Sequence, residues 1–429
     1  MKIKVDVIII GSGAGGATVA RDLAKAGKDV LVIERGPFIE RFGTIRSVTR
    51  CYDKCALRKS KEGVTVYRAL MVGGTTVVSC GNGIVVLNRE LKNLGIDLEE
   101  EFTETKEELK IKPLSNNLIG KGSKLIMDKG NKLDLEMEPM PKFINSERCV
   151  SCGMCVLGCK TGAKWSSIEF IKEMQQYGGK LITGLDVKSI VIHGGRAIGL
   201  IARSGQREVR VYAKKIILSA GGIGSPVILR RSGIKKAGNK LFVDLFNVTY
   251  GILRNNKINL CNEPTMAVVS RKFLEEKGFI LSPFIDIPLV LRWISPKNVY
   301  FKGYKHMNLL GIMTKIKDDN EGLVMEDETF HKLPSVGDYE KLNTGAYLAK
   351  QILLEAGIKE KDIFTTKPRA AHPGGSNAIG EIVDTDLKTE IENLFVCDAS
   401  VLPVSCGAPP IVTIVSLAKR LSKFLKNHG

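Results

Sequence analysis

The sequence has no long apolar run: no stretch approaches the roughly 20 apolar residues that a membrane-spanning helix requires. Its start, MKIKVDVIIIGSGAGG, leads into a glycine loop without the small-residue cleavage site of an export signal, so we expect a cytoplasmic protein. Aromatic residues make up only 6% of the chain, and no basic cluster is interleaved with them. That argues against nucleic-acid binding, because single-strand binders need stacking aromatics along a basic groove.

What the sequence does contain is typical of a large globular protein. Its 429 residues, 44% hydrophobic and 26% charged, predict two or three structural units around a sizeable core. Lys and Arg exceed Asp and Glu by 64 to 46, which gives a net charge of +18. This excess of positive charge is consistent with a lysine-rich solvated surface. The alternative is a surface that attracts a small acidic electron carrier or an anionic membrane.

The ten cysteines do not indicate a disulfide framework, because the chain has no recognisable export signal. Six of them are scattered along the sequence. The other four lie within eleven residues, in the segment SERCVSCGMCVLGCKTGAKW: Cys149, Cys152, Cys155 and Cys159. Four cysteines packed in this way indicate a metal ion or a cluster.

The N-terminal segment predicts a dinucleotide-binding unit. VDVIII reads as a strand buried on both faces, ATVARDLAKAG as a helix that ends at Gly27, and DVLVIE as a second buried strand. Between strand and helix, Gly11 would allow a tight turn, Gly13 would let a pyrophosphate approach the backbone, and Gly16 would let the helix pack closely on the strand. Glu34 follows Gly11 by 23 residues, the spacing expected of a carboxylate that binds an adenosine ribose.

Four further segments, in this order, decide between FAD and NAD. They are RALMVGGTTVVSCGNGI (68–84), SAGGIGSPVILRRSGI (219–234), AAHPGGSNAIG (370–380) and NLFVCDASVLPVSCGAPPIVTIVSLAKRL (393–421). Together with the N-terminus they resemble the glucose–methanol–choline (GMC) oxidoreductases, a family of FAD enzymes, over nearly the whole chain. The resemblance implies an α/β fold: a Rossmann-type FAD-binding domain built from discontinuous segments, with an inserted α+β substrate domain.

The resemblance also implies which residues hold the FAD. The diphosphate, ribose, adenine and flavin contacts would come from Gly11, Gly13, Gly16, Glu34, Gly73, Gly74, Thr75, Val187, Ala220, Asp398 and Ala399.

His372 is the catalytic residue that the resemblance implies. In the family, the histidine of an H-P-x-G-G segment takes the hydroxyl proton of an alcohol while hydride passes to the flavin, and a histidine suits this because its pKa lies near neutrality. The sequence departs from the family at two places. Pro409 occupies the place of a second His or Asn, and Ser79 that of a frequent Asn, so ordinary aerobic alcohol oxidation is in question.

The cysteine run has the C-x2-C-x2-C-x3-C spacing that ferredoxins use for a 4Fe-4S cluster. Lys160, however, stands where ferredoxins have proline, and the fourth ligand could be Cys159 or a remote cysteine, Cys51 or Cys55. Four thiolates also suit structural zinc, and a loop without metal is the third reading.

These interpretations divide the chain into five parts. Residues 1–135 and 166–235 form the first and second parts of the FAD-binding domain, 136–165 the cysteine-rich loop, 236–360 the substrate domain, and 361–429 the C-terminal part with the active-site histidine.

The function that follows is an FAD-dependent oxidoreductase that exchanges hydride with an alcohol, aldehyde or unsaturated isoprenoid. Electrons would pass through the cluster to or from an acidic carrier such as ferredoxin. The alternatives are a conventional GMC alcohol dehydrogenase with a structural cysteine loop, or a non-catalytic electron-transfer subunit.

Overall fold

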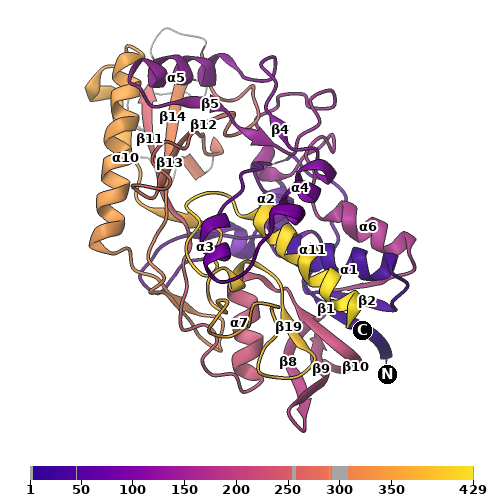
Figure 1. Ribbon diagram of the computed structural model, residues 1–429. Coiled ribbons are helices and arrows are strands. Elements are labelled where there is room, and N and C mark those ends of the chain that lie inside the picture. Colours follow the sequence, from indigo (N-terminus) through magenta and orange to yellow (C-terminus); the bar gives the residue numbers. More distant parts are fainter. Residues whose placement is uncertain (1–2, 45, 254–257, 289, 292–307, 429) are drawn as a thin grey trace.

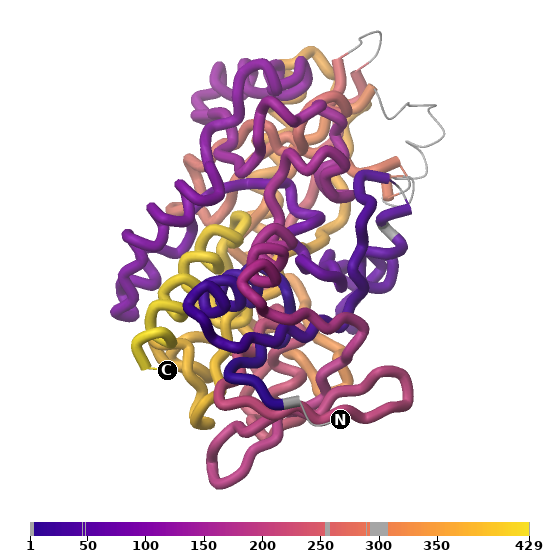
Figure 2. The backbone as a smooth tube through the Cα atoms, turned by 90° about the vertical axis from the view of Figure 1, so that its right-hand side faces the viewer, coloured from indigo at the N-terminus to yellow at the C-terminus, as the bar shows by residue number. Residues whose placement is uncertain are grey.

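The computed structural model describes residues 3–44, 46–253, 258–288, 290–291 and 308–428. Two large sheets form its frame, one at the lower right and the other at the upper left of Figure 1. Both termini lie on the side of the first sheet, as Figures 1 and 2 show. Residues 254–257 and 292–307, which belong to the expected substrate domain, lie outside the described residues.

The first sheet has seven strands, in the order β7-β2-β1-β10-β9-β8, and β19 also pairs with β10. Strands β7, β2, β1, β10 and β19 are parallel, whereas β8, β9 and β10 form an antiparallel meander. Because β1 lies between two strands and beneath helices, Val7 to Ile10 are at most 4% exposed, which explains the unbroken apolar run. The strands are β1 (Ile3–Ile10), β2 (Val30–Glu34), β7 (Lys180–Thr183), β8 (Asp186–His193), β9 (Arg196–Ser204), β10 (Arg207–Leu218) and β19 (Leu394–Val396).

Four helices pack together beside the first sheet (Figure 1): α1 (Ala14–Lys25), α4 (Glu99–Glu108), α6 (Ile168–Gln176) and α11 (Ile411–Asn427). The buried Arg21 joins three of them, because its guanidinium donates from α1 to Glu108 on α4 and lies 3.7 Å from the ring centroid of Phe170 on α6. A fifth helix, α7 (Gly221–Arg231), contacts β8.

The second sheet has eight strands, in the order β3-β18-β11-β14-β13-β12-β5, with β17 also paired to β11. Every residue of β11 and β14 is buried, because α10 (Val336–Glu355) lies against them, with α5 (Lys121–Lys132) next to it. The helix sits so close that a Cβ on Gly345 would come within 2.1 Å of Thr314. The strands are β3 (Val66–Tyr67), β5 (Met137–Pro139), β11 (Leu245–Ile252), β12 (Val268–Ser270), β13 (Phe279–Pro283), β14 (Leu309–Ile316), β17 (Ile363–Thr365) and β18 (Arg369–Ala371).

The remaining elements are short: α2 (Arg46–Cys51), α3 (Asn88–Asn93), β4 (Lys112–Pro113), β6 (Pro141–Lys142), β15 (Leu323–Val324) and β16 (Phe330–His331). The cysteine segment contains only a 3-10 turn, Cys155–Leu157. No helix in the described ranges is long and apolar enough to cross a membrane.

The α/β fold class and its main elements are confirmed. The predicted strand–helix–strand unit is β1-α1-β2, and the segment IVTIVSLAKRLSKFLKN, whose pattern predicts a closing helix, is the helix α11. One helix differs: the sequence pattern predicts a helix over residues 114–133, but α5 begins only at Lys121. The reason is that Leu114 donates its backbone N–H to the Met140 carbonyl and Leu118 closes a turn on Ser115, so this backbone is engaged elsewhere.

Candidate active site

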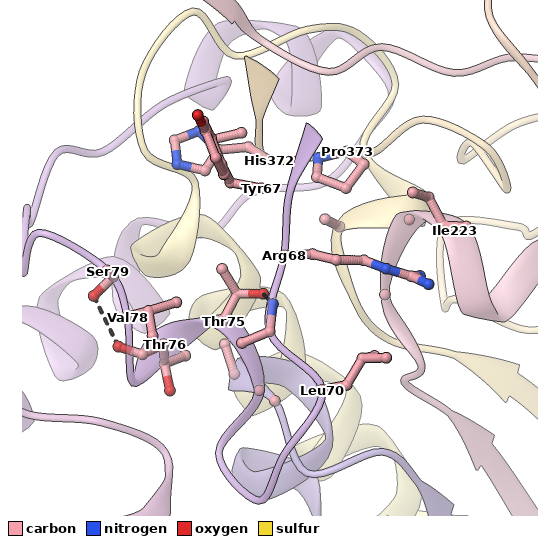
Figure 3. Close-up of a pocket in the computed structure, with 18 of the residues that line it drawn as sticks. Tyr67, Arg68, Leu70, Thr75, Thr76, Val78, Ser79, Ile223, His372 and Pro373 are labelled. Atoms are coloured by element: carbon pink, nitrogen blue, oxygen red, sulfur yellow. Dashed lines mark hydrogen bonds between the residues drawn. The ribbon is translucent and has the colours of Figure 1, made fainter. Parts of the chain in front are cut away.

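A pocket lies between the two sheets and is lined by both. The first sheet contributes the loop after β1, the second contributes β11 and β14, and the chain segments around His372 and Asp398 complete the wall. Figure 3 shows this pocket, with Tyr67 and Thr75 on one chain segment and His372 and Pro373 on another. The loop after β1 lies at the carboxyl end of a parallel strand, which is where open α/β sheets bind nucleotides.

The glycine loop has the geometry that a pyrophosphate requires. Gly11 has a φ of +101°, and a Cβ there would lie 2.3 Å from the Ser219 carbonyl oxygen. A Cβ on Gly16 would lie 2.1 Å from the Gly11 oxygen, so its absence lets α1 rest on the strand. Gly13 differs: it lines the pocket and has nothing within 4 Å of its Cβ position, which leaves room for a ligand at the N-terminus of α1.

Glu34 lies at the end of β2, 7% exposed, and lines the same pocket. Its carboxylate accepts hydrogen bonds from Ser12 Oγ at 2.6 Å, from Ser12 N at 3.1 Å and from Gly36 N at 2.9 Å. Burial raises the pKa of Glu34, and these three donors oppose the rise. The carboxylate is therefore fixed at the pocket wall, ready to accept from a sugar hydroxyl.

The turn at 73–75 is attached directly to the glycine loop. Gly73 N donates to Ser12 Oγ at 3.0 Å, and a Cβ on Gly74 would come within 3.1 Å of the Gly13 Cα. Gly74 and Thr75 line the pocket, whereas Gly73 and Gly16 support it from behind.

Asp398 orders the segment after β10. It is 6% exposed and accepts from Gly221 N at 2.8 Å, from Ser225 Oγ at 2.5 Å and from Ser400 N at 2.7 Å. Burial raises its pKa, and the hydrogen bonds oppose this rise. With it, Ala220 and Ala399 reach the pocket wall, and so does Val187 of β8.

His372 faces the pocket and forms a pair that the sequence did not reveal. Its Nδ1 lies 3.0 Å from Oδ2 of Asp244, whose side chain is fully buried while that of His372 is 21% exposed. The other oxygen of Asp244 accepts from Ser405 Oγ at 2.7 Å and from the backbone of Cys406 and Gly407, each at 3.1 Å. Since the carboxylate accepts at Nδ1, the ring carries its proton there and presents Nε2 as a base.

Electrostatics keep this histidine neutral. The pKa of His372 is lowered to about 4, mainly by burial and in addition by the nearby Lys315 ammonium, against the opposing effect of Asp244. Both His372 (φ 81°) and Asp244 (φ 49°) have left-handed backbones, conformations that cost energy for residues with side chains and that gather at functional sites. A periodicity in the sequence could not have found Asp244, because it lies 128 residues away and meets His372 only where β11 pairs with β18 in the second sheet.

The cysteine loop forms the neighbouring wall through Val156 and Leu157. Cys149, Cys152, Cys155 and Cys159 form no disulfide bond and are all partly buried. Across the described ranges, no three His, Cys, Asp or Glu side chains form a group that could hold a metal ion. The predicted cluster is therefore not confirmed.

Two buried lysines stand beside this loop. Lys142, 2% exposed, donates to the Cys80 carbonyl at 2.9 Å, to Asn82 Oδ1 at 2.6 Å and to the Thr265 carbonyl at 2.8 Å. Lys164, 4% exposed, donates to the carbonyls of Val77 at 2.8 Å, Ser79 and Cys155. Burial lowers the pKa of Lys142 to about 8, and neither lysine forms a salt bridge with any carboxylate that the structure describes.

The glycine loop, the fixed carboxylate at the end of β2 and a base facing the same pocket are the features of a dinucleotide-dependent oxidoreductase. The GMC oxidoreductase family profiles match residues 5–255 and 336–418, and the chain belongs to that family. It is therefore an FAD-dependent enzyme of the class that includes oxidases acting on alcohols.

The chain is similar to several known proteins. An uncharacterized protein of Methanocaldococcus jannaschii is 32% identical over 97% of this chain and 98% of its own length. A long-chain-alcohol oxidase of Arabidopsis thaliana is 24% identical over 98% of this chain and 68% of its own. Among solved structures, pyridoxine 4-oxidase from Mesorbium loti has a TM-score of 0.76 at 14% identity and covers 99% of this chain and 100% of its own. At that identity the likeness concerns the fold alone.

Gly13 and Gly15 provide a matched pair of tests. Gly13→Ala adds a methyl group in open space and should leave the fold intact but weaken FAD retention, because the methyl enters the space beside the phosphates. Gly15→Ala places its Cβ 1.9 Å from the Cys397 carbonyl oxygen and should destabilise the protein itself. Thermal unfolding of the apoproteins and bound flavin per chain would separate the two effects. Full flavin occupancy and affinity in a folded Gly13→Ala protein would contradict the site.

Proposed function

We propose that this protein oxidises an alcohol, or reduces the corresponding carbonyl, with His372 as the acid–base residue, and that it exchanges single electrons with an acidic carrier through a 4Fe-4S cluster at the cysteine loop. The observation that supports the first half is the His372–Asp244 pair in the wall of the pocket. The diphosphate and ribose of FAD would be held by the glycine loop and Glu34, with Asp398, Ala399, Gly74 and Thr75 nearer the flavin.

Each protein group has a definite task in this reaction. FAD, when bound, supplies the two-electron acceptor for the hydride of the alcohol carbon. His372 Nε2 accepts the hydroxyl proton, and Asp244 holds the ring in the tautomer that leaves this nitrogen free. The second-sheet side chains exclude water from the reacting carbon.

The cluster is supported by charge. Two buried ammonium groups without a carboxylate partner are costly unless anions lie nearby, and the thiols of the loop are the groups next to them. Four thiolates around iron and sulfide would supply that negative charge, and a bound cluster would carry single electrons at the pocket wall. The backbone is left-handed at Ser151, Gly153 and Gly158, and the loop therefore turns at these positions.

The fourth ligand is best assigned to Cys159. Its sulfur lies 3.5 Å from Thr161 Oγ1, and hydrogen bonds from this hydroxyl and from the backbone of Thr161, Ala163 and Lys164 lower its pKa, although burial acts in the opposite direction. Such donors favour a thiolate, the form that binds metal. Cys51 is 1% exposed within the hydrophobic core, and Cys55 is exposed to solvent. Neither is therefore as well placed as Cys159 to bind metal as a thiolate.

An acidic carrier would suit the surface around this loop. The backbone of Gly43 donates to the Leu157 carbonyl, so the segment near residue 43 lies against the loop. Exposed basic residues from both segments flank it, namely Arg41, Arg46, Arg148 and Lys160. Glu40 and Glu147 are the acidic residues exposed in the same stretches, which leaves the surface basic on balance.

His372→Ala should retain FAD but slow flavin reduction by an alcohol substrate roughly 10²- to 10⁴-fold, because the proton loses its acceptor. His331→Ala is the matched control, since His331 is exposed and bonded to Glu62 away from the pocket wall. Stopped-flow absorbance of the flavin measures both. An undiminished rate in His372→Ala would contradict the assignment.

The same base predicts the pH profile. The pKa of His372 is lowered from about 6.5 to about 4, so the base stays neutral on acidification until the pH approaches 4. Flavin reduction by the alcohol should therefore hold from pH 8 to about 5 and fall below. A loss centred near pH 6.5 would indicate an unperturbed histidine and contradict its burial beside Lys315.

Metal analysis tests the cluster. Anaerobically purified protein should contain about four irons and four sulfides per chain, with flavin absorbance. Cys159→Ser should lose most of the iron, whereas Cys55→Ser should keep it. One zinc per chain without sulfide would refute the cluster and leave the FAD site untouched.

If the carrier is acidic, the rate of electron transfer should depend on salt concentration. Electron transfer with an acidic ferredoxin should slow steeply as ionic strength rises, because screening removes long-range attraction to the basic surface. Reduction of the flavin by a neutral alcohol is the control and should change little, because an uncharged reactant is not guided by the basic surface. A rate that is insensitive to salt would contradict an electrostatically guided carrier.

A further inference from the structure

Lys315 is a buried lysine in the pocket wall that the proposed reaction has not used. The pocket wall built by the second sheet is mainly apolar, lined by Phe246, Phe284 and Met313. Its two charged members differ in their surroundings. Asp286 is bound by both guanidinium nitrogens of Arg369, at 2.7 and 2.8 Å. The other, Lys315 of β14, is a cation only 2% exposed.

The surroundings of Lys315 leave its charge largely unneutralised. Its Nζ donates to the backbone carbonyl of Asp244 at 3.0 Å and lies 5.3 Å from the centroid of the Phe246 ring. It forms no salt bridge with a carboxylate in the part of the chain that the structure describes. Burial lowers the pKa of Lys315, and the more distant carboxylates of Asp244 and Asp318 oppose that shift. A buried ammonium in the wall of a pocket is poised to receive an anion.

A second buried lysine shows the contrast. Lys332 is also 2% exposed, but it forms a salt bridge with Oδ2 of Asp318 at 2.8 Å and does not line the pocket. The charge of Lys332 is neutralised by a carboxylate, whereas Lys315 contacts a carbonyl and an aromatic ring.

Lys315 and His372 are held by the same residue. The ring Nδ1 of His372 contacts the side chain of Asp244 and Lys315 Nζ contacts its backbone, each at 3.0 Å. Asp244 therefore fixes both the base and the ammonium on the same wall of the pocket.

We propose that Lys315 is a further catalytic residue, one that donates a hydrogen bond to the substrate oxygen and stabilises the negative charge that develops there. This rests on the proposed function of the pocket as an alcohol site. The hydroxyl proton would pass to Nε2 of His372, the oxygen would gain charge beside the ammonium, and its electron pair would form the carbonyl as hydride leaves carbon for the acceptor that bound FAD would supply. Two electrons leave the alcohol, and one proton stays on the histidine.

Anion binding tests this without turnover. Octanoate carries a negative oxygen where the reacting alkoxide would lie, and octanamide is its neutral counterpart. The FAD-loaded protein should bind octanoate at least tenfold more tightly than octanamide in a titration followed by flavin absorbance, with calorimetry as an independent measure. Lys315→Met should abolish this preference. Lys332→Met should lower the unfolding temperature yet keep the preference for octanoate.

Single-turnover kinetics adds a second readout. With octan-1-ol, Lys315→Met should slow flavin reduction about 10²- to 10³-fold, with little change in alcohol affinity. An unchanged preference for octanoate in Lys315→Met overturns the proposal. If that variant does not fold, equal affinity of the native holoenzyme for octanoate and octanamide overturns it. Failure of octan-1-ol to reduce the flavin despite octanoate binding would refute the alcohol reaction and leave the anion site standing.

Discussion

Backbone contact at the glycine loop is the constraint on which the rest of this structure depends. Cβ atoms on Gly11 and Gly15 would lie 2.3 and 1.9 Å from carbonyl oxygens of Ser219 and Cys397, segments that are far away in the sequence. Only residues without a side chain allow these backbones to meet. The contacts join β1, the end of β10 and the end of β19 at one place, and the first sheet closes around them. The floor of the pocket is the direct result.

Asp244 plays the corresponding part for the second sheet. It follows Val243 into β11, and its carboxylate accepts from Ser405 and from the backbone of the next two residues, which lead into α11. The same carboxylate orients His372. One buried side chain thus ties the second sheet to the C-terminal segment of the first and sets the direction of the base. Such a group carries a high cost of burial, which its four hydrogen bonds offset.

The sequence predicts the main elements of the fold better than it predicts the residues of the site. The β1-α1-β2 unit and α11 were predictable, because buried parallel strands and amphipathic helices leave strong local patterns. Short strands such as β3 and β18, only two and three residues long, have no such pattern, since they exist only through pairing with each other and with β11 in the second sheet. The same holds for the site. His372 was identified through its motif, whereas Asp244, Lys315, Lys142 and Lys164 have no local signal, because their meaning comes from burial and from partners in other segments.

Three buried lysines make one region of the pocket wall positively charged. The thiol of Cys80, itself in the pocket wall, has its pKa raised to about 11 by burial, and three lysines oppose that rise: Lys142, Lys164 and Lys315. All three therefore act on the same region of the wall. On the proposed function, each event at this wall adds negative charge: an alkoxide forms beside Lys315, and electrons arriving at the cysteine loop do so beside Lys142 and Lys164. Fixed positive charges in a region shielded from water stabilise such states with little reorganisation. On the proposed function, the placement of the lysines would therefore favour the more negative, reduced state at both places.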